Sequence, residues 1–264
     1  MPACLATAAT LIAMMSTSPV PPQTGQMIII VTDDWSSVKG EAHRFERRGR
    51  SFHPVGRPFP VVVGQNGLGW GLGLHRSDSL AGPRKQEGDQ RGVAGVFRLA
   101  RAMGYAATPP RRFKIPYQPA REQTRCVDDP AAEQYNQIVE VVAGEAPPWT
   151  SAERMRRDDE LYRWLVVIEH NTAQPIQRGR GSCIFFHLWR APDRGTLGCT
   201  AASEERVLEL LAFLDPARSP VLIQLPRAVY QELRVAWGLP EVRRLTDLER
   251  VASPPLPRYV PGGD

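Results

Sequence analysis

The chain has 264 residues, of which 42% are hydrophobic and 23% are charged, as in ordinary soluble globular proteins. Its 33 Lys and Arg residues exceed its 28 Asp and Glu residues by a small, scattered margin, which favours a solvated surface over attraction to an anionic polymer. The basic clusters lack the interleaved aromatic residues of a single-strand binder, so we expect no nucleic-acid partner: Arg44–Arg50, Arg111–Lys114 and Arg154–Arg157.

The N-terminal segment, residues 1–26, is interpreted as a signal segment and a linker. Leu5–Met15 resembles the short apolar core of a secretion signal and is too short to span a bilayer as a helix. No Lys or Arg precedes it, and no clean small-x-small cleavage site follows it. We expect no stable membrane span, one folded domain over residues 27–239, and a loose Pro-rich tail over residues 240–264.

The first elements of the domain are predicted to be strands. The runs 27–32 and 60–64 have the composition of buried strands, and the charged stretch 41–52 between them could be the next strand of a meander. The Gly-rich stretch 64–73 lacks both the Lys-Ser/Thr of a phosphate-binding P-loop and the dinucleotide glycine spacing, so we interpret it as a structural turn or bulge. Residues 92–99 predict a turn that enters a strand.

The middle of the chain is less regular. Residues 105–125 hold four prolines and few helix signals, which indicates a long loop, either one that covers a cleft or a plain surface connection. Residues 138–142 are a short strand or a helix edge, and the polar stretch 151–162 is predicted to be helical. The apolar runs 164–170 and 183–188 are predicted to pair as core strands.

The last third changes to a helical pattern. Ser203 is a plausible N-cap, and leucines and valine recur at helical spacing until Asp215-Pro216 ends the run. A strand over 221–225 and a helix over 228–237 follow. Together these elements predict one β-dominated α+β domain.

A histidine twelve residues before a cysteine is the most informative chemical pattern. His187 lies in an apolar run, and the turn Thr196-Leu197-Gly198-Cys199 presents the thiol. The thiolate is the reactive form of cysteine, and an adjacent imidazole can take its proton and hold the pair as thiolate and imidazolium. The N–H groups of Gly198 and Cys199 could face a developing oxyanion, supported by Thr196 and Leu197. A helix beginning after Cys199 would lower the thiol pKa. The alternative is a buried structural thiol.

The other cysteines and histidines give weaker signals. Cys126 and Cys183 could pair if the chain is exported, or could be two buried thiols; spacing does not decide between them. Because C-x-x-C, H-x-x-x-H and H-E-x-x-H patterns are absent, we expect no metal and no cofactor. The remaining histidines are isolated and are interpreted as structural or exposed: His43, His53, His75 and His170.

At these residues the chain resembles the catalytic domain of the L,D-transpeptidases, bacterial cell-wall enzymes whose signature is a strand histidine followed by Ser/Thr-x-Gly-Cys. His187 and Thr196–Cys199 match that signature. Supporting segments extend the resemblance to about residues 27–226: Lys85–Asp89, Gly95–Phe97, Val127–Pro130, Tyr135-Asn136 and Gly181–Phe185.

Three features depart from the family pattern. Thr200 stands where many members carry an arginine, so that charge must come from elsewhere, for example from Arg190 or Arg194. Val93-Ala94-Gly95 stands where a proline is usual, and the gap between His187 and Cys199 is shorter than in several members.

The resemblance implies a β-sandwich of mixed sheets with flanking helices, and Cys199 and His187 at one end of a cleft. It also implies export to the periplasm or cell envelope, and we expect a monomer. The implied reaction has two steps: Cys199 displaces a D-amino acid from a peptidoglycan stem peptide, with His187 as the proton carrier, and an amine of a second stem then attacks the thioester. A backbone carbonyl often orients the histidine in this family, so Asp193 is not assigned as a third member.

Other readings of the same site remain open. Water could take the acyl group instead, giving a peptidoglycan L,D-carboxypeptidase or amidase. A non-enzymatic wall-binding module would not need both His187 and Cys199, and a cytosolic thiol protease would need a third partner that we cannot place. Asn171 and Ser182 are weak candidates for substrate contact, and Asp128 and Asp129 form a structural turn or part of a substrate-facing loop.

Overall fold

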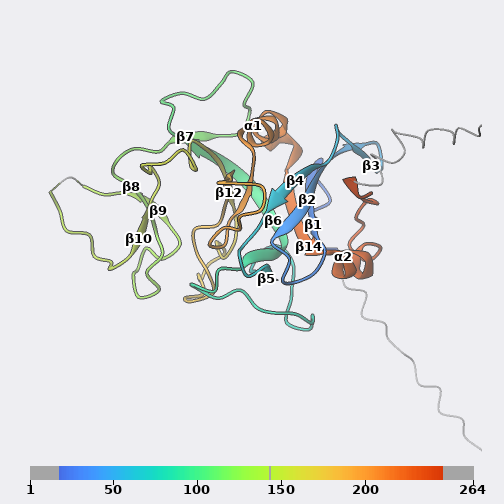
Figure 1. Ribbon diagram of the computed structural model, residues 1–264, viewed down its shortest axis with the longest axis horizontal. Coiled ribbons are helices and arrows are strands. Elements are labelled where there is room, and N and C mark those ends of the chain that lie inside the picture. The colour runs from blue at the N-terminus through green and yellow to red at the C-terminus, as the bar shows by residue number, and fades with distance from the viewer. Residues whose placement is uncertain (1–17, 143, 246–264) are drawn as a thin grey trace, which may run out of the picture.

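The computed structural model describes residues 18–142 and 144–245, which form a β-rich body with two short α-helices (Figure 1). The expected signal core at residues 5–15 and most of the expected tail over residues 240–264 lie outside these ranges. Within the described ranges, no helix has the length and apolar character needed to cross a membrane.

Eight strands close into a mixed barrel. Around the ring they are β1 (Gln26–Thr32), β14 (Val221–Pro226), β6 (Gly92–Gly104), β11 (Trp164–Ile168), β12 (Phe185–Leu188), β13 (Thr200–Ala202), β4 (Phe59–Val62) and β2 (Lys39–Arg48), and β2 pairs again with β1. The β1–β14 and β12–β13 pairs are parallel, and the other pairs in the ring are antiparallel.

The closed ring corrects the expected β-sandwich. The long strand β6 pairs with β14 through residues 95–98 and with β11 through residues 99–104. It therefore joins two neighbouring parts of the ring. The β1–β2 ladder then joins its ends, which removes the open edges that a sandwich would keep. Apolar patterning identifies strands but not their distant partners, and therefore could not separate these two architectures.

The remaining elements surround the barrel. The strands β3 (Ser51–Pro54), β5 (Leu68–Trp70) and β7 (Tyr117–Pro119) extend its sheet, whereas β8 (Thr124–Val127), β9 (Ile138–Glu140) and β10 (Ala152–Arg154) form a separate three-stranded sheet. The helix α1 (Glu204–Phe213), the 3₁₀ turn η1 (Pro216–Arg218) and the helix α2 (Arg227–Leu233) complete the fold. In Figure 1 the small sheet lies at the end of the molecule opposite α2.

Strand β1 shows why the continuous apolar run predicts a strand buried on both faces. Ile28 and Ile30 pack in one core cluster with Phe97 and α1, whereas Met27 and Ile29 pack in another, which also contains Tyr230 of α2. Successive strand residues point to opposite faces, so the run buries every residue of the strand.

Most predicted strands and two of the three predicted helices are confirmed, including the paired runs 164–170 and 183–188. Ser203 is the N-cap of α1, although its side chain makes no capping hydrogen bond. The predicted helix over 151–162 is wrong: Ala152–Arg154 pair with β8 as strand β10, and turns follow. This stretch lacks the apolar periodicity that would stabilise a helix by packing, so pairing with β8 decides its conformation.

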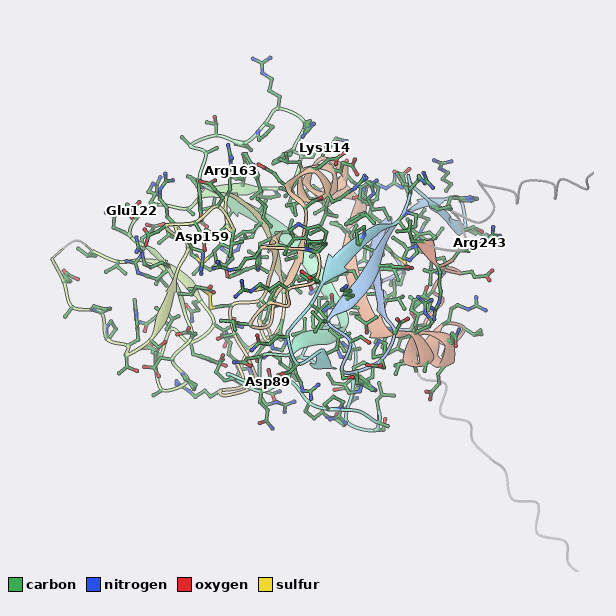
Figure 2. The ribbon with its side chains drawn as sticks, in the orientation of Figure 1. Asp89, Lys114, Glu122, Asp159, Arg163 and Arg243 are labelled. Atoms are coloured by element: carbon green, nitrogen blue, oxygen red, sulfur yellow. A yellow bond between two sulfur atoms is a disulfide. The ribbon has the colours of Figure 1, made fainter. Side chains whose placement is uncertain are left out.

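None of the residues 105–125 lines the pocket that contains Cys199 and His187, so the Pro-rich stretch does not cover it. Phe113 packs edge-on against Trp164, and Lys114 forms a 2.9 Å ion pair with Asp215 beyond α1. In Figure 2, Lys114 lies at the periphery of the molecule, like Glu122 and Arg243. The stretch is a surface connection that includes β7.

Candidate active site

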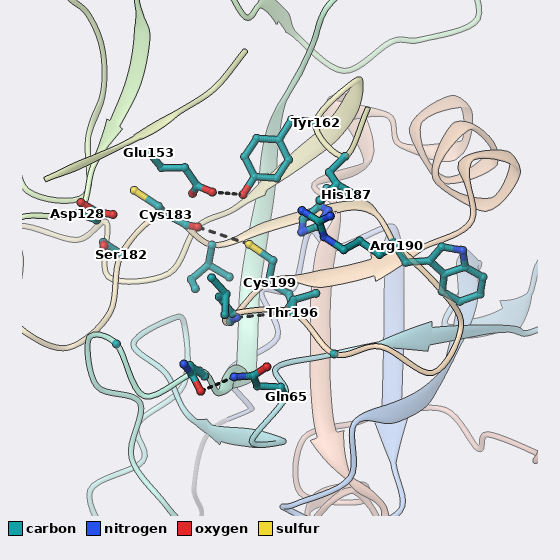
Figure 3. Close-up of a pocket in the computed structure, with 18 of the residues that line it drawn as sticks. Gln65, Asp128, Glu153, Tyr162, Ser182, Cys183, His187, Arg190, Thr196 and Cys199 are labelled. Atoms are coloured by element: carbon teal, nitrogen blue, oxygen red, sulfur yellow. Dashed lines mark hydrogen bonds between the residues drawn. The ribbon is translucent and has the colours of Figure 1, made fainter. Parts of the chain in front are cut away.

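A pocket of about 800 Å³ brings Cys199 and His187 together (Figure 3). It is also lined by six further residues that the sequence singled out: Asp128, Ser182, Arg190, Arg194, Thr196 and Leu197. Gly198 completes the turn at its wall. The pocket therefore contains both the predicted nucleophile, Cys199, and the predicted base, His187.

The parallel pair β12–β13 sets the positions of the two groups. Its register places Phe186 opposite Thr200, so Phe185 lies beside Cys199, and the Phe185 N–H donates to Cys199 Sγ at 3.3 Å. His187 is two residues beyond Phe185 and thus on the same side of the strand. The barrel register brings the imidazole and the sulfur to one face.

The imidazole of His187 is held by its own backbone. Its Nδ1 lies 2.7 Å from the carbonyl oxygen of Leu188. A carbonyl only accepts hydrogen bonds, so Nδ1 carries the hydrogen and Nε2 keeps its lone pair. The ring also packs edge-on against Tyr162, with centroids 5.0 Å apart. This arrangement matches the carbonyl-oriented histidine that the resemblance implied.

Burial sets the ionisation of both groups. It raises the pKa of Cys199 to about 12, an effect that Glu153 reinforces and that the Phe185 N–H opposes. It lowers the pKa of His187 to about 4. Burial therefore favours the neutral form of both groups, which differs from the thiolate and imidazolium pair expected from the sequence. The expected help from a helix terminus is also wrong, because β13 lies between Cys199 and α1.

The turn before Cys199 is internally bonded. The Thr196 hydroxyl donates to the carbonyl oxygen of Cys199 at 2.6 Å and accepts from the Gly198 N–H at 3.1 Å. Gly198 has φ of +149°, a conformation that side chains rarely adopt. Leu197 is 76% exposed at the pocket rim. The Gly198 N–H, an expected oxyanion donor, is thus already engaged in this state.

The weaker candidates divide into two groups. Ser182 donates to Glu87 at 2.8 Å, and Arg190 pairs with Asp159 at 3.0 Å, both at the pocket. Asn171 does not line this pocket: its side chain is buried and bonded to the backbone of Gln177 and Gly181. Its amide groups are saturated, so its role is to hold a turn.

A disulfide joins Cys126 of β8 to Cys183, two residues before β12. Cys183 is therefore not a free thiol, and its carbonyl oxygen accepts from Cys199 Sγ at 3.6 Å. Cys199 is the free cysteine of the described ranges. Both hydrogen-bond partners of its sulfur, Cys183 and Phe185, lie on the segment that the disulfide anchors.

Sequence reasoning missed Glu153 and Tyr162, which line the same pocket. The Tyr162 hydroxyl donates to Glu153 Oε1 at 2.6 Å, and its ring lies against His187. Both residues fall in the polar stretch 151–162 that was predicted to be helical. The sequence signal for this part of the site was the set Glu153, Arg157 and Tyr162. Their spacing alone does not show that these side chains point into the pocket.

A barrel that carries a cysteine beside a carbonyl-oriented histidine in one pocket has the site of a thiol-dependent acyl-transfer domain. A family model described as the YkuD L,D-transpeptidase catalytic domain matches residues 40–223, and the chain belongs to this family. A search of curated proteins and a search of solved structures returned no match to the chain. Membership confirms the resemblance and implies L,D-transpeptidase-type activity, with peptidoglycan stem peptides as substrates.

Proposed function

We propose that the protein is a peptidoglycan L,D-transpeptidase that forms cross-links between stem peptides through a thioester on Cys199. The observation that carries this proposal is the placement of Cys199 Sγ and a His187 whose Nε2 is unprotonated in one 800 Å³ pocket. A pocket of this size accommodates a peptide segment beside the sulfur.

In the first step, His187 Nε2 takes the thiol proton while Cys199 Sγ attacks the amide carbonyl that follows an L-centred residue. The C–S bond forms and the C–N bond breaks, and the proton on His187 passes to the departing D-amino acid. Because both groups are neutral beforehand, this proton moves during the attack. The Phe185 N–H beside the sulfur favours the developing thiolate.

The oxyanion of this step would lie against the N–H groups of Gly198 and Cys199. Since the Gly198 N–H donates to Thr196, substrate binding must displace or share that bond. In the second step an amine of another stem attacks the thioester and releases the thiol, which forms the cross-link.

The proposal includes export to the periplasm or cell envelope. The Cys126–Cys183 disulfide supports it, because such bonds persist in oxidising compartments and are rare in the cytosol.

Intact mass spectrometry tests the proposal directly. Incubation with a purified disaccharide-tetrapeptide should give an adduct equal to the substrate minus its terminal D-amino acid, mapped to Cys199, and cross-linked dimers in the medium. Cys199→Ala should give neither product, while keeping the melting temperature of the parent. No adduct on the parent protein, with folding and the disulfide verified, refutes the proposed function.

A further inference from the structure

The pocket carries carboxylates on one side of Cys199 and an arginine on the other. Figure 3 shows Glu153 and Asp128 on one side of the sulfur, and His187 and Arg190 on the other. Carboxylates beside the nucleophile suit a substrate that carries positive charge. The wall formed by Asp128 and Glu153 is here called the acidic wall.

Glu153 has an oxygen available to a ligand. Its Oε1 accepts from the Tyr162 hydroxyl at 2.6 Å and lies 3.4 Å from Arg157. Its Oε2 accepts no hydrogen bond from the part of the chain that the structure describes. The side chain is 25% exposed, and it lines the pocket. One oxygen thus fixes the carboxylate, and the other remains for an incoming donor.

Asp128 adds a second unsatisfied acceptor. Its Oδ1 is buried and has no hydrogen-bond partner among the described residues, although the residue lines the pocket. A buried oxygen without a donor is costly, and nearby positive charge would relieve part of that cost. Its charge also acts on Glu153, which shows that the two carboxylates are close.

Arg157 offsets this negative charge only in part. Its Nε and terminal nitrogen make the short, paired contacts to Asp159, at 2.9 and 3.1 Å, rather than to Glu153. Arg190 also pairs with Asp159. The acidic wall therefore keeps an affinity for a cation.

We propose that the acidic wall binds the ammonium group of the acceptor amine, and that Glu153 takes one proton from it before it attacks the thioester. This inference rests on the proposed function. The amine forms the C–N bond, the C–S bond breaks, its second proton returns to the sulfur through His187, and the proton on Glu153 leaves to solvent. Glu153 is then the residue that selects an amine over water as acceptor.

The ionisation of Glu153 agrees with this role. Burial raises its pKa to about 6, with Asp128 and Asp159 adding to the shift and Tyr162 and Arg157 opposing it. Tyr162 also faces Cys199, Arg157 and His187. A carboxyl group that titrates near neutral pH is ionised enough to bind an ammonium group and basic enough to accept a proton from it.

A competition between acceptors tests the inference. The donor is the disaccharide-tetrapeptide, and the acceptors are Nα-acetyl-lysinamide, which is an ammonium ion at pH 7, or hydroxylamine, which is largely uncharged. The ratio of aminolysed to hydrolysed donor is measured by liquid chromatography and mass spectrometry. Both products come from one acyl-enzyme, so the ratio does not depend on the rate of acylation.

Glu153→Gln keeps an oxygen for Tyr162 and should lower the ratio for Nα-acetyl-lysinamide by about tenfold, with no matching fall for hydroxylamine. In the parent protein, the ratio for Nα-acetyl-lysinamide should rise with pH near pH 6. In Glu153→Gln that rise should be flattened. Asp128→Asn should act in the same direction and serves as a second variant if Glu153→Gln folds poorly. Glu160→Gln, an exposed carboxylate outside the pocket, is the control and should match the parent.

An unchanged ratio in both variants, or an equal fall for both acceptors, overturns the inference. A parent protein that acylates Cys199 but transfers the acyl group only to water also overturns it, while leaving the thioester chemistry intact. A parent protein that forms no acyl-enzyme instead refutes the proposed function, so the two failures are distinguishable.

Discussion

The Nδ1 atom of His187 hydrogen-bonds the carbonyl oxygen of the next residue, Leu188, at 2.7 Å. The backbone on either side of that carbonyl is itself fixed: the Leu188 N–H donates to Leu161, and the Trp189 N–H donates to Ala202. The imidazole is therefore oriented by the barrel ladder and needs no carboxylate partner. The hydrogen bond to the Leu188 carbonyl places the ring hydrogen on Nδ1, and burial favours the neutral ring.

Replacing His187 should impair acylation rather than folding. His187→Ala removes the proposed proton carrier, and we expect acyl-enzyme formation to slow by about 10²- to 10⁴-fold. The measurement is the rate of Cys199 adduct formation by intact mass spectrometry. His53→Ala, at an exposed position in β3, is the matched control. Acylation of His187→Ala at the parental rate excludes this role for the imidazole.

The pH dependence of the alkylation rate of Cys199 should be that of a protonated thiol with a raised pKa. Because burial raises its pKa to about 12, the rate with iodoacetamide should climb steadily from pH 7 beyond pH 9. The urea-unfolded protein should instead follow an ordinary thiol, near its usual value of 9.0. A rate that is flat between pH 6 and 8 contradicts this expectation, because it is the profile of a thiolate and imidazolium pair.

Removing the disulfide should affect both stability and the nucleophile. The bond between Cys126 and Cys183 closes a separation of 57 residues, for which chain entropy predicts about 4 kcal/mol of stabilisation. A Cys126→Ala/Cys183→Ala variant should melt roughly 10 °C lower. It should also acylate more slowly below its melting transition, since Cys183 and Phe185 position the sulfur.

The control for this prediction is the exposed pair Glu160→Gln and His53→Ala combined, which leaves the disulfide in place. Equal acylation rates with and without the bond would show that the segment around Cys183 holds its geometry unaided.

Acid should destabilise the protein through its buried histidines. Burial lowers the pKa from the usual 6.5 to about 4 for His43, His75 and His187, and to about 3 for His170. Between pH 6.5 and these values the unfolded chain binds protons that the folded chain does not. This contribution to stability is complete above pH 6.5 and is lost as the pH falls towards 4.

Urea unfolding at several pH values between 7.5 and 4.5 measures this effect as a falling midpoint. His43→Gln should reduce the slope, because it removes one of the four titrating groups. A midpoint that stays constant over this interval contradicts the assignment of neutral buried imidazoles.

Several features of this protein followed from the sequence because their causes are local. The apolar run Met27–Val31 predicts a fully buried strand, the spacing of leucines after Ser203 predicts α1, and His187 with Thr196–Cys199 predicts the thiol chemistry and the family. Each signal depends on residues a few positions apart, where strand or helix periodicity and turn chemistry act directly.

Only the tertiary structure decided the closure of the barrel, the pairing of Cys126 with Cys183, and which polar residues face the sulfur. It excluded Asn171 from the pocket and brought in Glu153 and Tyr162. It also decided that burial favours the neutral forms of Cys199 and His187, because their pKa values depend on how completely the folded chain removes them from water. Distant pairing and desolvation are properties of the assembled barrel, and no short stretch of the chain encodes them alone.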